Sequence, residues 1–231
     1  GQYHAWTEIN VPQRPFEIEN VDTVTVPLAQ SGYTTEYLRY RITINDRPNE
    51  TNYYRIVIDK QTTLWGYNHE EGGDDYIYWT KHSYNFIGRE DVVLTDGQPT
   101  TGDDEDNGLF DTAKNIYGVF DDTRFRNTSY TMTVYNNTKI ETGSDSGYFS
   151  GMDVIIRLMS ITETEYYYLK ALNLVDSDAY DETINEPIKY PSNVHGGTGM
   201  VGISTEVTQT IHIISSSHSK GNLAPPVHVY Q

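Results

Sequence analysis

The alternation of apolar and polar residues along the chain predicts short strands through most of its length. In residues 37–44 every second side chain is large and apolar, which is the pattern of a strand with one buried face. Residues 52–59 follow a turn rich in Asn, Asp and Pro, so we expect the two segments to pair as an antiparallel hairpin. Comparable segments lie at 21–26, 64–67, 76–80, 128–135 and 206–214. Residues 153–160 are apolar at both parities, which indicates a strand covered on both faces. The pattern is typical of a mainly β protein, either an antiparallel β-barrel or a β-sandwich.

One helix is expected, at about residues 162–175. Thr162 with Glu165, and Ser160 with Glu163, each match a capping box, in which the hydroxyl and the carboxylate satisfy backbone N–H groups, so the helix starts at Ser160 or Thr162. A single buried stripe is predicted from apolar residues at helical spacing: Ile161, Tyr168, Leu169, Leu172 and Val175. Because Tyr168 falls on this stripe, Tyr166 or Tyr167 is a candidate for an exposed contact residue. Packing in the core or at its rim is the simpler explanation for both.

The domain organisation is expected to be simple. A chain of 231 residues suits one large β domain. We expect residues 1–20 to form a strand, at 2–11, and a linker, and residues 21–231 to form the β-rich domain. Residues 96–107 are too polar to contribute to a core, so they are expected to form a loop.

Composition and charge narrow the classes of partner. The chain has 33 acidic and 16 basic residues and a formal net charge of −17, so phosphate groups of nucleic acids and anionic lipids should repel it. It has no cysteine, which excludes disulfides, thiolate nucleophiles and zinc–thiolate sites. No apolar run approaches the roughly 20 residues of a membrane span. The 20 tyrosines fit sheet core and surface first, with an aromatic surface for sugar or protein as the alternative.

Two motifs invite a ligand-binding interpretation. Asp104, Asp106 and Gly108 have a spacing compatible with a calcium loop, but the terminal Glu and the flanking helices of an EF-hand are absent. A solvated acidic loop is therefore the favoured explanation. Residues 197–202 match G-x-G-x-x-G, yet a Pro-Ser-Asn loop precedes them and alternating residues follow. This context favours glycines that let a loop enter a strand over a dinucleotide site.

The sequence shows no assembled catalytic constellation. His195 stands beside two glycines and could be a ligand or general base, although a surface-loop histidine is the simpler explanation. The acidic pairs Asp121–Asp122 and Asp74–Asp75 could in principle serve a glycosidase, but adjacent residues of a strand point to opposite faces. We therefore expect no enzyme activity, no catalytic residues and no cofactor.

Four blocks, taken in order, resemble a known family of bacterial proteins. They lie at residues 52–58, 119–125, 155–172 and 185–202, and the similarity extends over roughly residues 6–214. Together they resemble the family listed as domain of unknown function 4249. The resemblance implies export through a lipobox cysteine, a place in the outer membrane of Gram-negative bacteria, and frequent association with TonB-dependent transporters. Since members usually have an immunoglobulin-like domain before this region, residues 1–20 are expected to be a remnant of that domain.

Three functional hypotheses follow. The first is an extracytoplasmic, non-catalytic binding module that is an accessory to a TonB-dependent transporter and is held at the membrane only by a lipid anchor absent from this chain. The second is a carbohydrate-binding or glycoside-cleaving envelope protein, for which aromatic and acidic abundance is the support. The third is a structural or adhesion component of the envelope. No catalytic residues are established for the family, so the resemblance transfers none.

Overall fold

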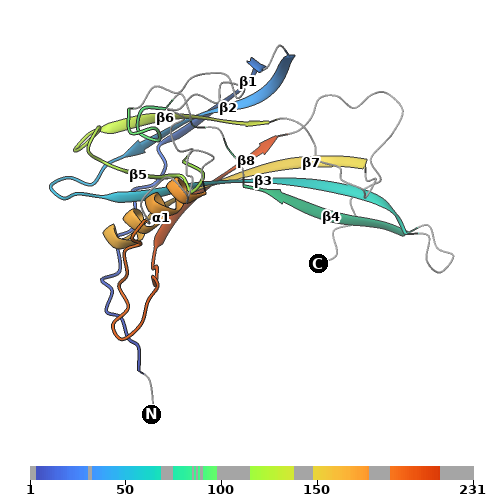
Figure 1. Ribbon diagram of the computed structural model, residues 1–231. Coiled ribbons are helices and arrows are strands. Elements are labelled where there is room, and N and C mark those ends of the chain that lie inside the picture. The colour runs from blue at the N-terminus through green and yellow to red at the C-terminus, as the bar shows by residue number, and fades with distance from the viewer. Residues whose placement is uncertain are drawn as a thin grey trace. The chain divides into compact units, whose positions relative to one another are not determined.

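The computed structural model shows a mainly β protein with two antiparallel sheets and one helix (Figure 1). It describes residues 4–30, 33–68, 75–84, 86, 88, 91–97, 115–137, 148–176 and 188–213. The elements are β1 (Asn20–Gln30), β2 (Tyr33–Asn45), β3 (Tyr53–Asn68), β4 (Asp75–Ser83), β5 (Val119–Asp121), β6 (Ser129–Asn137), β7 (Tyr148–Ser160), α1 (Glu163–Val175) and β8 (Thr205–Ile213). One sheet has the order β1-β2-β6, and the other has the order β4-β3-β7-β8 with β5 paired to β3. Within the described residues neither sheet closes into a barrel, so the architecture is of the sandwich type.

The chain divides into two compact units. The first comprises Gly1–Val57, Asn85–Thr138 and Arg157–Gln209, and the second comprises Ile58–Tyr84, Lys139–Ile156 and Thr210–Gln231. The first unit contains β1, β2, β5, β6 and α1. The candidate site described below lies wholly within this first unit.

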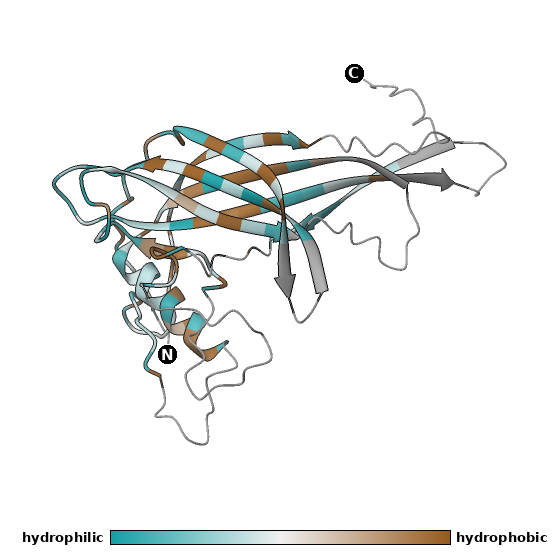
Figure 2. Cartoon of the chain, turned by 90° about the horizontal axis from the view of Figure 1, so that it is seen from above, coloured by the Kyte–Doolittle hydropathy of each residue, from teal (hydrophilic) through white to brown (hydrophobic). Residues whose placement is uncertain are grey.

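Strand burial follows the predicted alternation. On β2 the side chains of Leu38, Tyr40, Ile42 and Ile44 are buried, as expected for a strand with one apolar face. On β7, where the sequence predicted cover on both faces, Met152, Val154, Ile156, Leu158 and Ser160 are buried and the residues between them are half-buried, so one face is fully covered and the other partly. Figure 2 shows the resulting alternation of hydrophobic and hydrophilic residues along the strands.

The predicted hairpin of residues 37–44 with 52–59 is wrong. β2 pairs with β1 and β6, whereas β3 pairs with β4 and β5, so the two segments belong to different sheets. The connection contains two buried polar residues, Asp46 and Asn52, which bond to the segment that leads from β5 to β6. Because of these bonds, the chain that leaves β2 enters the other sheet as β3 and does not form a hairpin with β2.

The predicted strand at residues 2–11 is also wrong over its described part. Residues 4–19 contain a single isolated bridge, which joins Trp6 to His195. The partner segment is the glycine-rich loop at 191–204 instead of a strand, and Pro12 and Pro15 follow without backbone N–H groups to extend a ladder. The segments predicted at 52–59 and 64–67 are both parts of the single strand β3.

The helix is confirmed close to its predicted position. Thr162 is the N-cap, and its hydroxyl accepts the Glu165 N–H at 3.2 Å. Ile161 and Leu169 are buried as expected, but Tyr166 is buried too, with 2% of its surface exposed. Core packing, the simpler explanation for Tyr166, is therefore confirmed, and its candidate role as an exposed contact is wrong. Its hydroxyl donates to Asp121 Oδ2 at 3.0 Å and so can be buried without losing a partner. Tyr167 is 49% exposed.

Removal of the helix cap should have a measurable cost. Thr162→Ala is expected to lower the free energy of unfolding by about 1 kcal/mol, because the Glu165 N–H loses its acceptor. Thr162→Ser keeps the hydroxyl and should retain most of the stability. Urea unfolding followed by circular dichroism measures both variants. Equal losses in the two variants would show that the methyl group, and not the cap, matters.

Candidate functional site

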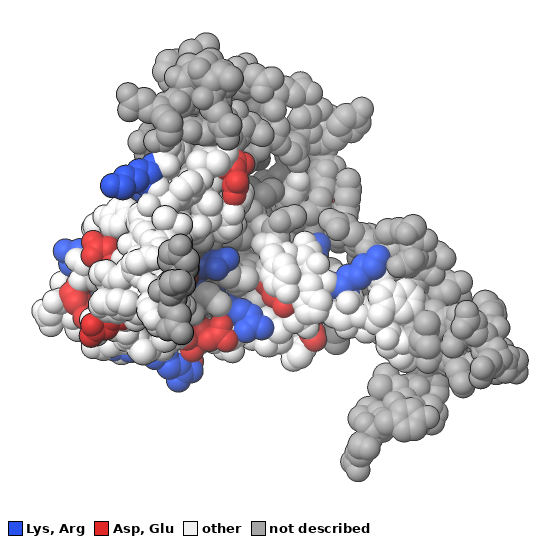
Figure 3. Space-filling view, turned by 60° about the horizontal axis from the view of Figure 1, so that its bottom comes forward, with Lys and Arg blue, Asp and Glu red and all other residues white. Residues whose placement is uncertain are grey.

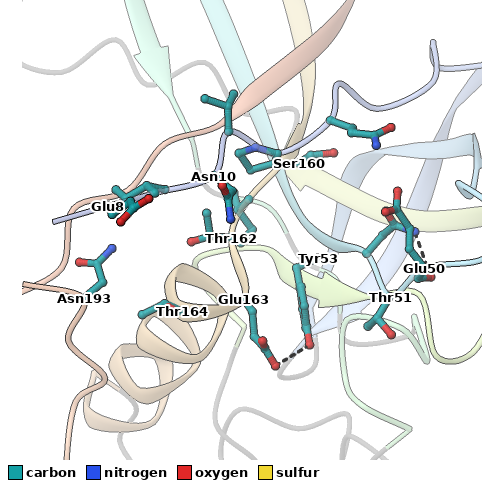
Figure 4. A pocket seen from close by; sticks show the side chains of 16 residues that line it. Glu8, Asn10, Glu50, Thr51, Tyr53, Ser160, Thr162, Glu163, Thr164 and Asn193 are labelled. Atoms are coloured by element: carbon teal, nitrogen blue, oxygen red, sulfur yellow. Dashed lines mark hydrogen bonds between the residues drawn. The ribbon is translucent and has the colours of Figure 1, made fainter.

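An open pocket of about 440 Å³ lies in the first unit, where four separated segments meet (Figure 4). Residues 8–13 contribute one part of its lining, and the others come from 50–53, 160–164 and Asn193. Most of the side chains that line it are carboxylates, hydroxyls or amides. The arrangement suits recognition of a polar molecule.

The wall formed by residues 8–13 is held against the loop that precedes β8. The Trp6 N–H donates to His195 O at 3.1 Å, and the His195 N–H donates to Trp6 O at 2.8 Å. Their rings stack with centroids 4.3 Å apart. Thr7 Oγ1 donates to Asn193 O at 2.6 Å, and Thr205 Oγ1 donates to Pro12 O at 3.2 Å. These bonds fix the segment at both ends, so His195 positions a wall of the pocket.

The opposite wall is formed by the first residue of β3 and the first turn of α1. Tyr53 OH donates to Glu163 Oε1 at 3.0 Å, and the Ile161 N–H donates to Tyr53 O at 3.0 Å. The Tyr53 ring packs on the Tyr166 ring, with centroids 4.9 Å apart. Burial, and then the Glu163 carboxylate, raise the pKa of Tyr53, so its hydroxyl stays protonated and remains a donor at neutral pH.

Negative charge collects around the pocket. Glu8, Glu50 and Glu163 all line it, and none of its lining residues is basic. Elsewhere the two signs are mixed: Figure 3 shows acidic and basic side chains next to one another on one face of the described surface. The pocket is therefore a local concentration of carboxylates, which disfavours anionic ligands.

One residue of the pocket lining, Asn52, belongs to a buried polar network that joins the segments 52–58 and 119–125. Asn52 lines the pocket, and Asp122 Oδ2 accepts both its backbone N–H at 2.9 Å and its Nδ2 at 3.1 Å. Arg126 Nη2 donates to Asp122 Oδ1 at 3.1 Å. Asp122 is completely buried and belongs to the scaffold.

Asp121 and Asp122 bond to different groups. Asp121 accepts hydrogen bonds from Thr123 and from the Tyr166 hydroxyl, whereas Asp122 faces Asn52 and Arg126. Burial alone would raise the pKa of Asp121, but the bonds from Thr123 and Tyr166 outweigh it and lower that pKa. Each carboxylate is engaged in a structural bond.

The structure separates the other residues singled out from the sequence. His195 is exposed and contacts Trp6, while Tyr167 lies on α1, and no contact in the described part of the chain joins the two. The calcium-loop prediction, Asp104, Asp106 and Gly108, lies outside the described residues, as does Asp74. Over the described ranges no group of three or more His, Asp or Glu is arranged to hold a metal ion.

The glycine motif is a loop that leads into a strand, as the sequence favoured. Residues 191–204 have no helix after them and lead directly into β8. Gly196 and Gly199 have φ angles of 77° and 120°, which side chains rarely adopt. A Cβ on Gly196 would also lie 2.5 Å from His4 O, so glycine is required where the loop meets the first segment.

Sequence reasoning missed the residues that line the pocket. Glu8, Glu50 and Ser160 belong to no motif, and each is remote in sequence from the others. The capping box located the start of α1 and therefore Glu163, but nothing local linked that turn to the first segment. A signal of paired variation between distant positions would be needed to find this site.

The carboxyl of Glu165, beside the glycine loop, gives a pH-dependent prediction. Burial raises the pKa of Glu165, partly offset by Arg55 and by the Ile203 N–H. A raised carboxyl pKa in the folded state gives stability that is present below the unfolded value of about 4.3 and is lost as pH rises through the folded value. Relative to Glu165→Gln, the parent protein should therefore be more stable at about pH 4 than at about pH 8. Urea unfolding of both proteins at the two pH values tests this, and a difference that grows with pH would contradict it.

One known protein family has a model that matches most of the chain. The family model described as Domain of unknown function (DUF4249) matches residues 1–210, which include all four of the blocks identified in the sequence. No curated protein matches the sequence. In the described part of the chain no helix combines the length and the apolar character needed to cross a membrane.

Proposed function

The chain belongs to the family described as domain of unknown function 4249, and we propose that it is a non-catalytic binding module of the cell envelope. The observation that carries this proposal is the polar pocket of about 440 Å³. Sites for small molecules are concave and occupy roughly 300–1,000 Å³, with a few polar groups that fix the orientation of the ligand. The pocket has this size, and hydrogen bonds hold its walls in place.

Binding is favoured over catalysis because Glu163 in the pocket, and Asp121 and Asp122 beside it, are already engaged. Glu163 accepts from Tyr53, and Asp121 accepts from Tyr166. Asp122 is buried beneath the pocket lining. A general acid or base must be free to exchange a proton with substrate, so these engaged carboxylates serve the scaffold better than a reaction.

The cellular context of the proposal comes from the family resemblance. We propose that the module acts outside the cytoplasm, at the outer membrane, as an accessory to a TonB-dependent transporter. A lipid anchor would attach it, since a net charge of −17 opposes direct contact with anionic head groups. The pocket would hold a small molecule near the transporter.

Exposed aromatic residues of the first unit supply contacts for such a partner. Trp6 is 59% exposed and Tyr167 is 49% exposed. Aromatic side chains with an apolar body and a polar edge are enriched at protein interfaces. We propose Tyr167 and the Trp6–His195 pair as contact residues.

Photo-crosslinking in intact cells tests the proposal. A photoreactive residue replaces Tyr167 in one variant and Asp22, an exposed residue of β1, in a control variant. The expected result is a crosslink from position 167 to a TonB-dependent transporter, with little or none from position 22. Recovery of no transporter from position 167, or equal recovery from both positions, would contradict the accessory role.

A further inference from the structure

Two carboxylates of the pocket have no partner among the residues that the structure describes. The side chains of Glu8 and Glu50 make no hydrogen bond or ion pair with any residue that the structure describes, in contrast to Glu163. Both residues are exposed, so their carboxylates are open to a ligand. A ligand that carries a positive charge would gain an attraction here that a neutral ligand would not, and an anionic ligand would be repelled.

A buried hydroxyl in the same pocket also lacks a partner. Ser160 is only 5% exposed and lines the pocket, yet its side chain bonds to no group among the described residues (Figure 4). The Ser160 oxygen is not among the fully buried polar atoms, so it is open to the pocket and a ligand hydroxyl could bond to it. This observation is independent of the carboxylates and indicates a ligand with hydroxyl groups.

The remaining lining groups fit the same chemistry. Asn10 and Thr164 line the pocket with an amide and a hydroxyl that can both donate and accept hydrogen bonds. Tyr53 places an aromatic ring and a phenolic group in the lining. A bare metal ion fits less well, since no described cluster of three acidic or histidine side chains is arranged for one.

From this arrangement we infer that the pocket binds small, hydroxylated organic cations, of which a hexosamine with a free amine is the simplest example. The amine pairs with Glu8 or Glu50, which lie on opposite sides of the pocket in Figure 4, and the ligand hydroxyls bond to Ser160, Asn10 and Thr164. The inference rests on the proposed function as a binding module and names the class of ligand that the module takes.

Isothermal titration calorimetry of the full chain with three six-carbon sugars tests the inference. Glucosamine, glucose and glucuronate have similar rings and carry positive, zero and negative charge at about pH 6.5, where an amine of this kind is protonated. We expect glucosamine to bind about 10-fold more tightly than either of the others. Added salt should weaken its binding, because screening acts on exposed charges.

Variants test whether the preference for glucosamine arises from residues of the pocket. The double variant Glu8→Gln and Glu50→Gln should weaken glucosamine binding by about 3- to 10-fold, because each exposed ion pair contributes a small attraction. Asp22→Asn removes one negative charge outside the pocket and should leave binding unchanged within about 2-fold. Ser160→Ala should weaken the binding of glucose and glucosamine alike, because it removes a hydroxyl contact and no charge.

Each outcome bears on the inference. Equal or tighter binding of glucose or glucuronate would overturn the ligand class, while small-molecule binding itself would stand. Failure of all three sugars to bind, or an Asp22→Asn effect as large as that of the double variant, would also overturn it. The accessory role would then still be judged by the crosslinking experiment, which uses no sugar.

Discussion

Asp122→Ala is expected to lower the free energy of unfolding by about 3 kcal/mol. Removing one partner from a buried, hydrogen-bonded charge pair typically costs about 3–5 kcal/mol, and here the partner Arg126 is partly exposed, which places the effect at the lower end. Asp122 also accepts two hydrogen bonds from Asn52, whose backbone N–H would be left buried without an acceptor. The alanine cannot replace either interaction.

Urea unfolding followed by near-ultraviolet circular dichroism measures this loss. Asp22→Ala is the matched control, because it removes an exposed carboxylate of β1 and should change the stability by less than about 0.5 kcal/mol. If Asp122→Ala were as stable as this control, the buried network would not be the scaffold of the pocket. A stable Asp122→Ala protein that had lost ligand binding would instead place Asp122 in the binding machinery.

Gly118→Ala is expected to lower the free energy of unfolding by about 2–4 kcal/mol. Gly118 has a φ angle of 65°, and a left-handed conformation costs an ordinary residue roughly 1–2 kcal/mol. A Cβ there would also lie 2.3 Å from Ile56 O, a backbone atom that cannot rotate away. Moving that carbonyl would strain the bond in which the Ile56 N–H donates to Gly118 O at 2.8 Å.

Gly151→Ala is the control for this substitution. A Cβ on Gly151 meets no atom within 4 Å, and no positive φ is found there, so alanine should be neutral or stabilise the protein by up to about 1 kcal/mol. Thermal and urea unfolding of the two variants in parallel give the comparison. Similar stabilities for the two variants would show that the segment before β5 tolerates a shift away from β3.

The sequence identified the parts of the fold that depend on local pattern. The alternation in β2 and the Thr162 cap of α1 each depend on residues close in sequence, and the structure confirms both; the Glu165 carboxylate lies beside Gly202 and does not complete the predicted capping box. Which strands pair with each other could not be predicted from the local pattern. The turn composition between β2 and β3 predicted a hairpin, but the bonds of Asp46 and Asn52 to residues more than 60 positions away take the chain into the other sheet.

Burial along α1 illustrates the same limit. Helical spacing identified Ile161 and Leu169 as buried but placed Tyr166 among the candidates for exposure. The hydroxyl partner that permits its burial, Asp121, lies 45 positions earlier in the chain. A tyrosine is buried or exposed according to whether its hydroxyl finds such a partner, and the periodicity of the helix contains no information about that.

The candidate site was the least predictable feature. Residues 8–13 and 160–164 both line the pocket, although they are far apart in sequence. The bridge that holds the first of these segments in place joins Trp6 to His195, 189 positions away. The motifs that attracted attention in the sequence serve other purposes: Asp121 and Asp122 belong to the scaffold, and the glycines shape a loop. Carboxylates without a partner can be recognised only when all their neighbours are known.

Hydrogen–deuterium exchange with and without glucosamine tests the central claim that ligand binds between the first segment and the start of α1. The account predicts slower exchange on ligand addition in peptides that cover residues 8–13, 50–53 and 160–164, and unchanged exchange in peptides that cover residues 20–27 of β1. Protection confined to segments outside the pocket, or no protection at a saturating concentration of the sugar, would contradict it.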